Sequence, residues 1–137
     1  MSRVAMVTGG QRGIGAAISE ALQAAGRKVV ASYAGNDAAA AAFTERTGIP
    51  CYKFDVGDYE ACIAAVAKIE AEVGQVEILV NNAGITRDAM MRKLTRQMWD
   101  EVIDTNLGSC YNMCKAVWDG MGSRKFGRIV NIGSVNG

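Results

Sequence analysis

Short apolar runs alternate with amphipathic segments along the whole chain. Runs rich in β-branched residues, which predict buried strands, occupy residues 3–8, 28–33, 51–56, 77–82 and 128–132. Segments with a helical spacing of apolar residues lie between them, at residues 14–26, 37–48, 58–74 and 95–121. Strands that read as continuous apolar runs, separated by amphipathic helices, are typical of parallel sheets with helices on both faces. Because such crossovers are right-handed, the pattern predicts an α/β fold with a doubly wound parallel sheet.

The longest predicted helix, residues 95–121, contains an irregular stretch. Its apolar stripe consists of Trp99, Ile103, Leu107, Cys110, Cys114, Val117 and Met121. Near the middle, Asn106 is surrounded by Thr105, Gly108 and Ser109, which are all poor helix formers in a helix interior. We therefore expect a local kink at Asn106, of a kind that suits a ligand or a water molecule.

The composition is that of an ordinary globular domain and excludes several classes of function. Half of the 137 residues are apolar, and the net charge of +1 comes from scattered basic residues, so we expect no nucleic-acid partner. No apolar window is long enough to span a membrane, and the N-terminus lacks a signal-peptide layout, which predicts a cytoplasmic protein without a membrane partner. The chain has no histidine, which excludes Ser-His-Asp and Cys-His catalysis. Acid–base chemistry must use Tyr, Lys, Ser, Asp or Glu.

The four cysteines do not have the spacing of a metal site or of a disulfide framework. They are Cys51, Cys62, Cys110 and Cys114. We expect all four to be reduced, packed thiols and expect no metal.

A glycine-rich turn, "VTGGQRGIGAA", joins the first strand to the first helix. In a doubly wound fold this turn faces the ligand crevice, and the N-terminus of the following helix offers free N–H groups to a phosphate. A glycine-rich turn without a ligand is the alternative, but the position between a strand and a helix favours a dinucleotide site.

The spacing of this turn is T-G-x-x-x-G-x-G, formed by Thr8, Gly9, Gly13 and Gly15. With it, the chain resembles the short-chain dehydrogenase/reductase family, which binds NAD(P) on a Rossmann-type fold. Further family landmarks follow in order: Asp55-Val56, "NNAG" at residues 81–84, Asn106 in "DTNLGS", and "NIGSV" after the fifth strand. These motifs cover essentially the whole chain. The resemblance implies that residues 1–137 are the NAD(P)-binding domain, truncated after the fifth strand.

The resemblance assigns most of the candidate site to cofactor binding. The implied cofactor-binding residues are Thr8, Gly9, Arg12, Gly13, Ile14, Gly15, Asp55, Val56, Asn82, Ala83, Gly84 and Ile85. An acidic residue ending the second strand would favour NAD(H), but here that strand ends in Ser32 and Tyr33. Arg12 lies where NADP-dependent members carry a basic residue, although it could also be a solvated turn residue. We expect NADP(H) rather than NAD(H).

The family's proton chemistry is only partly represented. The resemblance makes Ser134 the residue that binds the substrate oxygen, and Asn106 the residue that holds a water molecule in the proton relay. Each has a simpler alternative, a loop hydroxyl for Ser134 and a helix residue bonded to its own backbone for Asn106. The family's Tyr-x-x-x-Lys motif, expected after the serine, is absent; Tyr111 and Lys115 have this spacing but precede it. We expect the chain alone to be inactive.

Within the family, "NAGITRD" and "SVNG" are similar to the reductases of 3-oxoacyl thioesters, in particular those that form (R)-3-hydroxybutyryl-CoA for polyhydroxybutyrate synthesis. That resemblance makes an acyl-CoA the substrate and places Asp88 and Lys93 at its entrance. Reduction of 3-oxoacyl-[acyl-carrier-protein] in fatty acid synthesis is the alternative, and a dinucleotide-binding fragment without turnover is another.

The long helix packs across a subunit interface in the family. It carries more large apolar residues than one face can bury: Tyr111, Val117, Trp118 and Met121. We expect a homotetramer for the complete protein. We expect the fragment alone to be unstable, because the sheet edge at Val130 lacks a partner strand.

Overall fold

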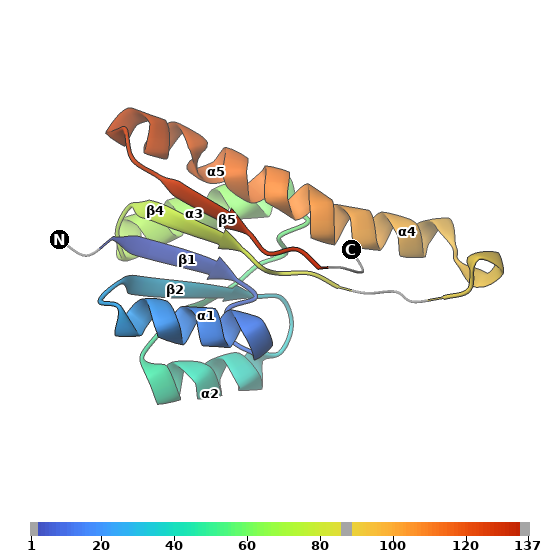
Figure 1. The fold of residues 1–137 in the computed structure, drawn as a ribbon, viewed down its shortest axis with the longest axis horizontal. Helices are drawn as coiled ribbons and strands as arrows, with labels where there is room; N and C mark the ends of the chain where they lie inside the picture. The colour runs from blue at the N-terminus through green and yellow to red at the C-terminus, as the bar shows by residue number, and fades with distance from the viewer. Residues whose placement is uncertain (1–2, 86–88, 135–137) are drawn as a thin grey trace.

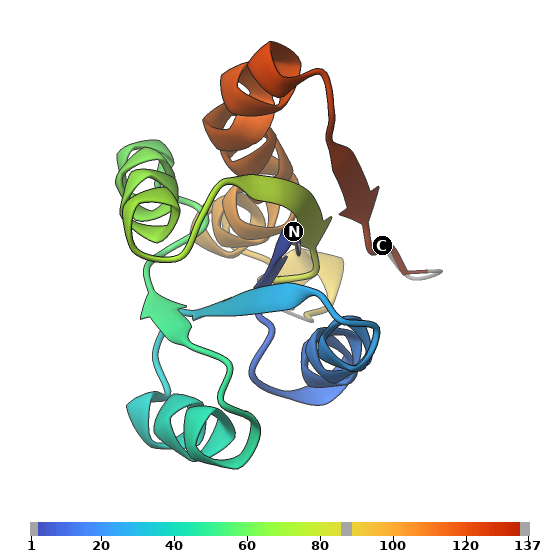
Figure 2. The same cartoon turned by 90° about the vertical axis from the view of Figure 1, so that its left-hand side faces the viewer.

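A computed structural model describes residues 3–85 and 89–134 (Figures 1 and 2). One sheet of five parallel strands forms its centre, in the order β3-β2-β1-β4-β5. The strands are β1 (Val4–Thr8), β2 (Lys28–Tyr33), β3 (Cys51–Lys53), β4 (Val76–Asn81) and β5 (Arg128–Asn131). The order reverses between β1 and β4, as in a Rossmann-type sheet, and the predicted fold class is confirmed.

Helices cover both faces of the sheet, as Figure 2 shows. They are α1 (Gly13–Ala24), α2 (Asp37–Thr47), α3 (Tyr59–Glu72), α4 (Arg96–Val102) and α5 (Ser109–Arg124). A 3₁₀ turn, η1 (Met91–Lys93), precedes α4, and a π-helical segment, η2 (Ile103–Gly108), joins α4 to α5. None of the helices in the described ranges is long and apolar enough to cross a membrane.

The core consists of two layers separated by the sheet. Side chains alternate along β1, so that Met6 contributes to one layer and Val7 to the other, and both are completely buried. The layer of Met6 contains α3 and α5, represented by Ile69 and Met113. The layer of Val7 contains α1 and α2, represented by Phe43. The central strands are therefore buried on both faces, as their apolar runs predict.

The third strand is shorter than predicted. It ends at Lys53 rather than at residue 56, because after the hydrogen bond from Phe54 N to Tyr33 O the chain turns away from β2. The turn is fixed by Asp55, whose carboxylate accepts from Gly57 N at 2.8 Å and whose carbonyl accepts from Asp58 N at 3.0 Å. Asp58 then caps α3 through Ala61 N, as its position predicts.

The distortion expected near Asn106 is confirmed as the π-helical segment η2, but the predicted apolar stripe is only partly correct. Trp99 and Leu107 are 54% and 66% exposed, whereas the buried face of α5 consists of Met113, Val117 and Met121, with Ser109 and Asn112. The wider π turn shifts the phase of the helix, so the periodicity of α4 does not continue into α5.

The expected surplus of apolar residues on this helix needs correction as well. Val117 and Met121 are buried against the sheet, so they belong to the core. Tyr111 and Trp118 are the residues that remain exposed, each at 62%.

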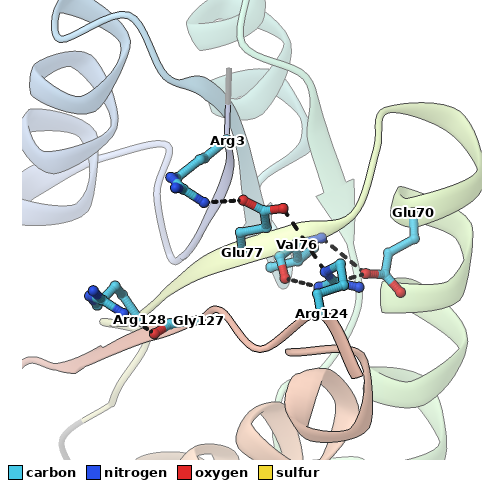
Figure 3. Close-up of polar contacts among 7 residues, drawn as sticks. All are labelled: Arg3, Glu70, Val76, Glu77, Arg124, Gly127 and Arg128. Carbon is cyan, nitrogen blue, oxygen red and sulfur yellow. Dashed lines mark hydrogen bonds and ion pairs between the residues drawn. The ribbon is translucent and has the colours of Figure 1, made fainter. Parts of the chain in front are cut away.

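A network of charged side chains closes the amino end of the sheet (Figure 3). Arg124, at the end of α5, donates to the carbonyl of Val76 at 2.9 Å, while the N–H of Val76 donates to the Glu70 carboxylate at 2.9 Å. Arg124 also lies 4.0 Å from Glu77, which forms a 2.7 Å ion pair with Arg3. The network fixes the start of β4 against α3 and against the turn that leads into β5.

Candidate functional site

An open groove of about 920 Å³ lies at the carboxyl end of the sheet, where β1, β4 and β5 end. Its lining residues are Arg12, Ile14, Asn82, Ala83, Gly84, Ile85, Val102, Ile103, Asn106, Leu107, Ile132, Gly133 and Ser134. They come from the loops after β1, β4 and β5 and from the junction of α4 with η2. The position is the one where doubly wound sheets bind ligands.

The loop between β1 and α1 has the backbone of a phosphate cradle. Gly9 and Gly13 have φ angles of 61° and 56°, which are strained for other residues. A Cβ atom at Gly15 would collide with the carbonyl oxygen of Gly9, so only glycine lets α1 begin this close to the loop. No side chain caps the N-terminus of α1, where Arg12 is the N-cap residue. The uncapped helix end and the close turn fit the pyrophosphate of a dinucleotide.

Hydrogen bonds of Thr8 and Asn82 hold this loop against the end of β4. The Thr8 hydroxyl accepts hydrogen bonds from Asn82 N at 2.9 Å and Ala83 N at 3.0 Å, and it is almost completely buried. The Asn82 amide donates in return to the carbonyls of Thr8 at 3.2 Å and Gly9 at 3.3 Å. These reciprocal bonds join the ends of β1 and β4, so the Thr8 side chain positions the groove without lining it.

Asn106 fixes the opposite wall. Its Oδ1 accepts from Ile85 N at 2.7 Å, and its Nδ2 donates to Ile85 O at 2.8 Å. The side chain therefore binds the backbone of the loop after β4, and it is not bonded to its own helix. Gly84 leaves room for this contact, since a Cβ there would lie 3.1 Å from Asn106 Oδ1.

The remaining predicted site residues differ in where they lie. Ser134 lines the groove after β5. Asp55 and Val56 are outside the groove lining, in the turn after β3, and Val56 is buried. Lys93 is exposed on η1, also outside the groove lining, and Asp88 falls outside the described residues.

Five groove residues were not predicted from the sequence. They are Val102, Ile103, Leu107, Ile132 and Gly133. Leu107 was assigned to the apolar stripe, but its place next to Asn106 in the irregular stretch was a usable signal. The other four carry no chemical signature, because they contribute only apolar surface or backbone.

The family model of the short chain dehydrogenases matches residues 3–137. The chain belongs to this family. A short chain dehydrogenase is an oxidoreductase that uses a nicotinamide dinucleotide, and the glycine cradle of this chain fits such a group.

Curated relatives are similar to this chain along nearly its whole length. An acetoacetyl-CoA reductase of Paracoccus denitrificans is 63% identical over 137 residues, which are all of this chain and 57% of that protein. An acetoacetyl-CoA reductase of Cupriavidus necator is 47% identical over 98% of the chain and 57% of its own length. A 3-oxoacyl-[acyl-carrier-protein] reductase of Escherichia coli is 42% identical over 98% of the chain and 56% of its own length. The chain thus spans little more than half the length of these relatives.

Tyr111, the tyrosine with a lysine four residues on, lies apart from the groove. Its ring stacks on that of Tyr59 from α3, with centroids 6.2 Å apart, and it is not a lining residue. Among the described residues, no group of three or more Cys, Asp or Glu side chains could hold a metal ion.

Proposed function

We propose that this short chain dehydrogenase forms part of an NADPH-dependent reductase that converts acetoacetyl-CoA to (R)-3-hydroxybutyryl-CoA, as in polyhydroxybutyrate synthesis. The observation that carries the proposal is the groove itself. Residues expected from separate motifs, Arg12, Asn82, Asn106 and Ser134, line one cavity at the carboxyl end of the sheet. The similarity to acetoacetyl-CoA reductases supports the substrate.

The dinucleotide supplies the hydride for this reduction. The chain's own residues bind and orient. The glycine turn and the uncapped start of α1 receive the pyrophosphate, and Asn106 keeps the Gly84–Ile85 loop in place through both polar groups of Ile85. The Ser134 hydroxyl donates a hydrogen bond to the carbonyl oxygen of the substrate. Asn106 retains one side-chain N–H for a water molecule in the proton relay.

The preference for NADP(H) rests on the charges around the adenosine end. The first carboxylate after β2 is Asp37, and it is already bound by the Tyr33 hydroxyl at 3.0 Å and by Lys53 at 3.2 Å. The Tyr33 hydrogen bond and the Lys53 cation lower the pKa of the Asp37 carboxyl. Asp37 therefore stays ionised, but Lys53 partly compensates its charge and its oxygens are already bound, so it is poorly placed to accept ribose hydroxyls. Arg12 supplies a cation in the groove for a 2′-phosphate.

The proposal assigns no proton donor to residues 1–137. Tyr111 is stacked on Tyr59 outside the groove, so we infer that residues 1–137 hold the cofactor and orient the substrate but do not protonate it. These residues then form an incomplete NAD(P)-binding domain that is inactive alone. A dinucleotide-binding chain without any turnover is the candidate of another class.

The substrate carrier and the assembly follow from the same resemblance. Lys93 and Asp88 would meet the CoA at the entrance. The exposed Tyr111 and Trp118 of α5 would pack against another copy in a homotetramer. The four free thiols suit the reducing cytoplasm.

A chimera tests the proposal. Residues 1–137 are joined to the part of the Paracoccus relative that the match leaves uncovered, and loss of NADPH absorbance is followed with acetoacetyl-CoA and with acetoacetyl-[acyl-carrier-protein]. We expect turnover with a preference for the CoA thioester, reduced by Lys93→Glu through a higher KM, and no turnover by residues 1–137 alone. A clear preference for the carrier protein would support the fatty acid reductase instead.

A further inference from the structure

The carbonyl of Val56, in the turn after β3, accepts hydrogen bonds from two side chains. It accepts from Asn112 Nδ2 at 3.0 Å and from Cys62 Sγ at 3.4 Å. Asn112 comes from α5 and Cys62 from α3, so two helices hold one peptide group. Asn112 is 7% exposed and Cys62 is completely buried.

The position of Asn112 is unusual for an amide. It lies on the buried face of α5 beside Met113, which with Val117 belongs to the apolar layer of the core. An apolar side chain would pack there without desolvating a polar group, whereas a buried amide is stabilising only when it is hydrogen-bonded. The bond to Val56 satisfies one donor of this amide across 56 positions of sequence.

The same continuous helix holds two loops at the carboxyl end of the sheet, the loop after β4 and the turn after β3. Asn106, in η2, binds the backbone of Ile85, and Asn112, in α5, binds the backbone of Val56. Two residues before Asn106, η2 also approaches the turn after β3 closely: a Cβ at Gly57 would lie 3.5 Å from the carbonyl oxygen of Asp104. The spacing between the two loops is therefore set by one rigid element.

We propose that Asn112 is a positioning residue for the adenosine half of the dinucleotide, acting through the Val56 carbonyl on the Asp55–Val56 turn. This inference rests on the proposed function, in which Asp55 and Val56 contact the cofactor. Cys62 assists as a neutral donor. Burial, with Asp55 and Asp58 nearby, raises the pKa of its thiol to about 12, so the S–H persists at physiological pH.

Binding of the two halves of the cofactor tests the inference. Dissociation constants of the chimera that joins residues 1–137 to the rest of the Paracoccus relative are measured for NADPH by calorimetry, and for 2′,5′-ADP and reduced nicotinamide mononucleotide by ligand-observed NMR. Asn112→Leu keeps a similar volume without a donor. We expect it to raise the constants for NADPH and 2′,5′-ADP roughly fivefold to tenfold, as for one lost hydrogen bond, and to leave the mononucleotide within about twofold.

A second variant and a control separate positioning from stability. Cys62→Ala removes the other donor to the same carbonyl, so it must weaken 2′,5′-ADP selectively as well; it decides the matter if Asn112→Leu does not fold. Val117→Ala opens a cavity on the same face of α5 and should lower the melting temperature with both half-cofactors bound as before. Equal losses for both halves, or unchanged affinity for 2′,5′-ADP in both variants, would overturn the role of Asn112. An unsubstituted chimera that binds neither NADPH nor its halves would instead refute the proposed function.

Discussion

The two ends of the central sheet are held together by different chemistry. At the amino end, four charged side chains, Arg3, Glu70, Glu77 and Arg124, pair with one another and with the backbone of β4 (Figure 3). At the carboxyl end the ties are neutral amides, which bind backbone groups of neighbouring loops. They come from Asn82, Asn106 and Asn112.

From this difference we infer that the amino end of the sheet contributes to stability and the carboxyl end to ligand binding. Paired charges suit an end that contributes to stability, because each one already has its partner. Neutral amides hold loops firmly without placing a fixed charge where phosphates are expected. Among the described residues that line the groove, Arg12 is the only charged one. An anionic cofactor would therefore meet a single cation and the positive end of α1.

The largest expected effect is at the carboxyl end, where Gly15→Ala introduces a methyl group against the Gly9 carbonyl. The turn must open, so NADPH affinity should fall more than about 100-fold, or about 2.7 kcal/mol. Calorimetric titration measures this loss. Gly35→Ala is the matched control, because Gly35 has open space around it and no positive φ. Undiminished binding by Gly15→Ala would show that the loop does not cradle the cofactor.

The corresponding change at the amino end is Arg124→Met. It leaves Glu70 and Glu77 without their partly buried cation, and the 19% exposure of Arg124 argues for a loss of about 2 kcal/mol of stability, less than for a fully buried pair. Urea unfolding measures the loss, and NADPH affinity should not change. Arg96→Met breaks the exposed pair with Asp100 and should cost less than about 0.5 kcal/mol. If Arg124→Met weakened binding as much as stability, the division between the two ends would be wrong.

Removing Arg12, the cation that lines the groove, tests the carboxyl end of the sheet through cofactor affinity. Arg12→Met should weaken NADPH binding roughly tenfold, since a charge-assisted bond to phosphate contributes about 1.5 kcal/mol or more. NADH binding should stay within about twofold. Parallel titrations with both cofactors provide the check, and an equal loss for both would assign Arg12 to the pyrophosphate instead.

The smallest expected effect comes from ionisation of the Cys62 thiol at high pH. The pKa of Cys62 is raised from 9.0 to about 12 by burial, so the folded chain keeps a proton that the unfolded chain releases above pH 9. Stability from this group is complete below pH 9 and declines as the pH rises toward 12. Between pH 9 and pH 10 it should contribute a decrease of about 1 kcal/mol. Urea unfolding of Cys62→Ala over the same interval should lack this component.

The sequence predicts most of the fold because strand and helix periodicities are local. The glycine spacing likewise locates the loop after β1, since Gly9, Gly13 and Gly15 are needed for the backbone itself. The end of β3 could not be predicted, because the apolar run continues through Phe54 and Val56 after pairing with β2 has ended.

Tertiary contacts account for what was missed at the two ends of the sheet. The π turn changes which residues of α5 face the core, so Leu107 moved from a predicted core position to the groove. The partners of Asn106 and Asn112 lie 21 and 56 positions away, and Arg124 meets Glu77 only after β4 is in place. No periodicity encodes such pairings.

The central claim is that the amide-lined groove at the carboxyl end of the sheet is a site for NADP(H). Calorimetric titration, with NADPH and with NADH, of the chimera that joins residues 1–137 to the rest of the Paracoccus relative tests it most directly. We predict one site per chain, with NADPH bound at least about tenfold, or about 1.4 kcal/mol, more tightly than NADH. Absence of binding, or tighter binding of NADH, would contradict it.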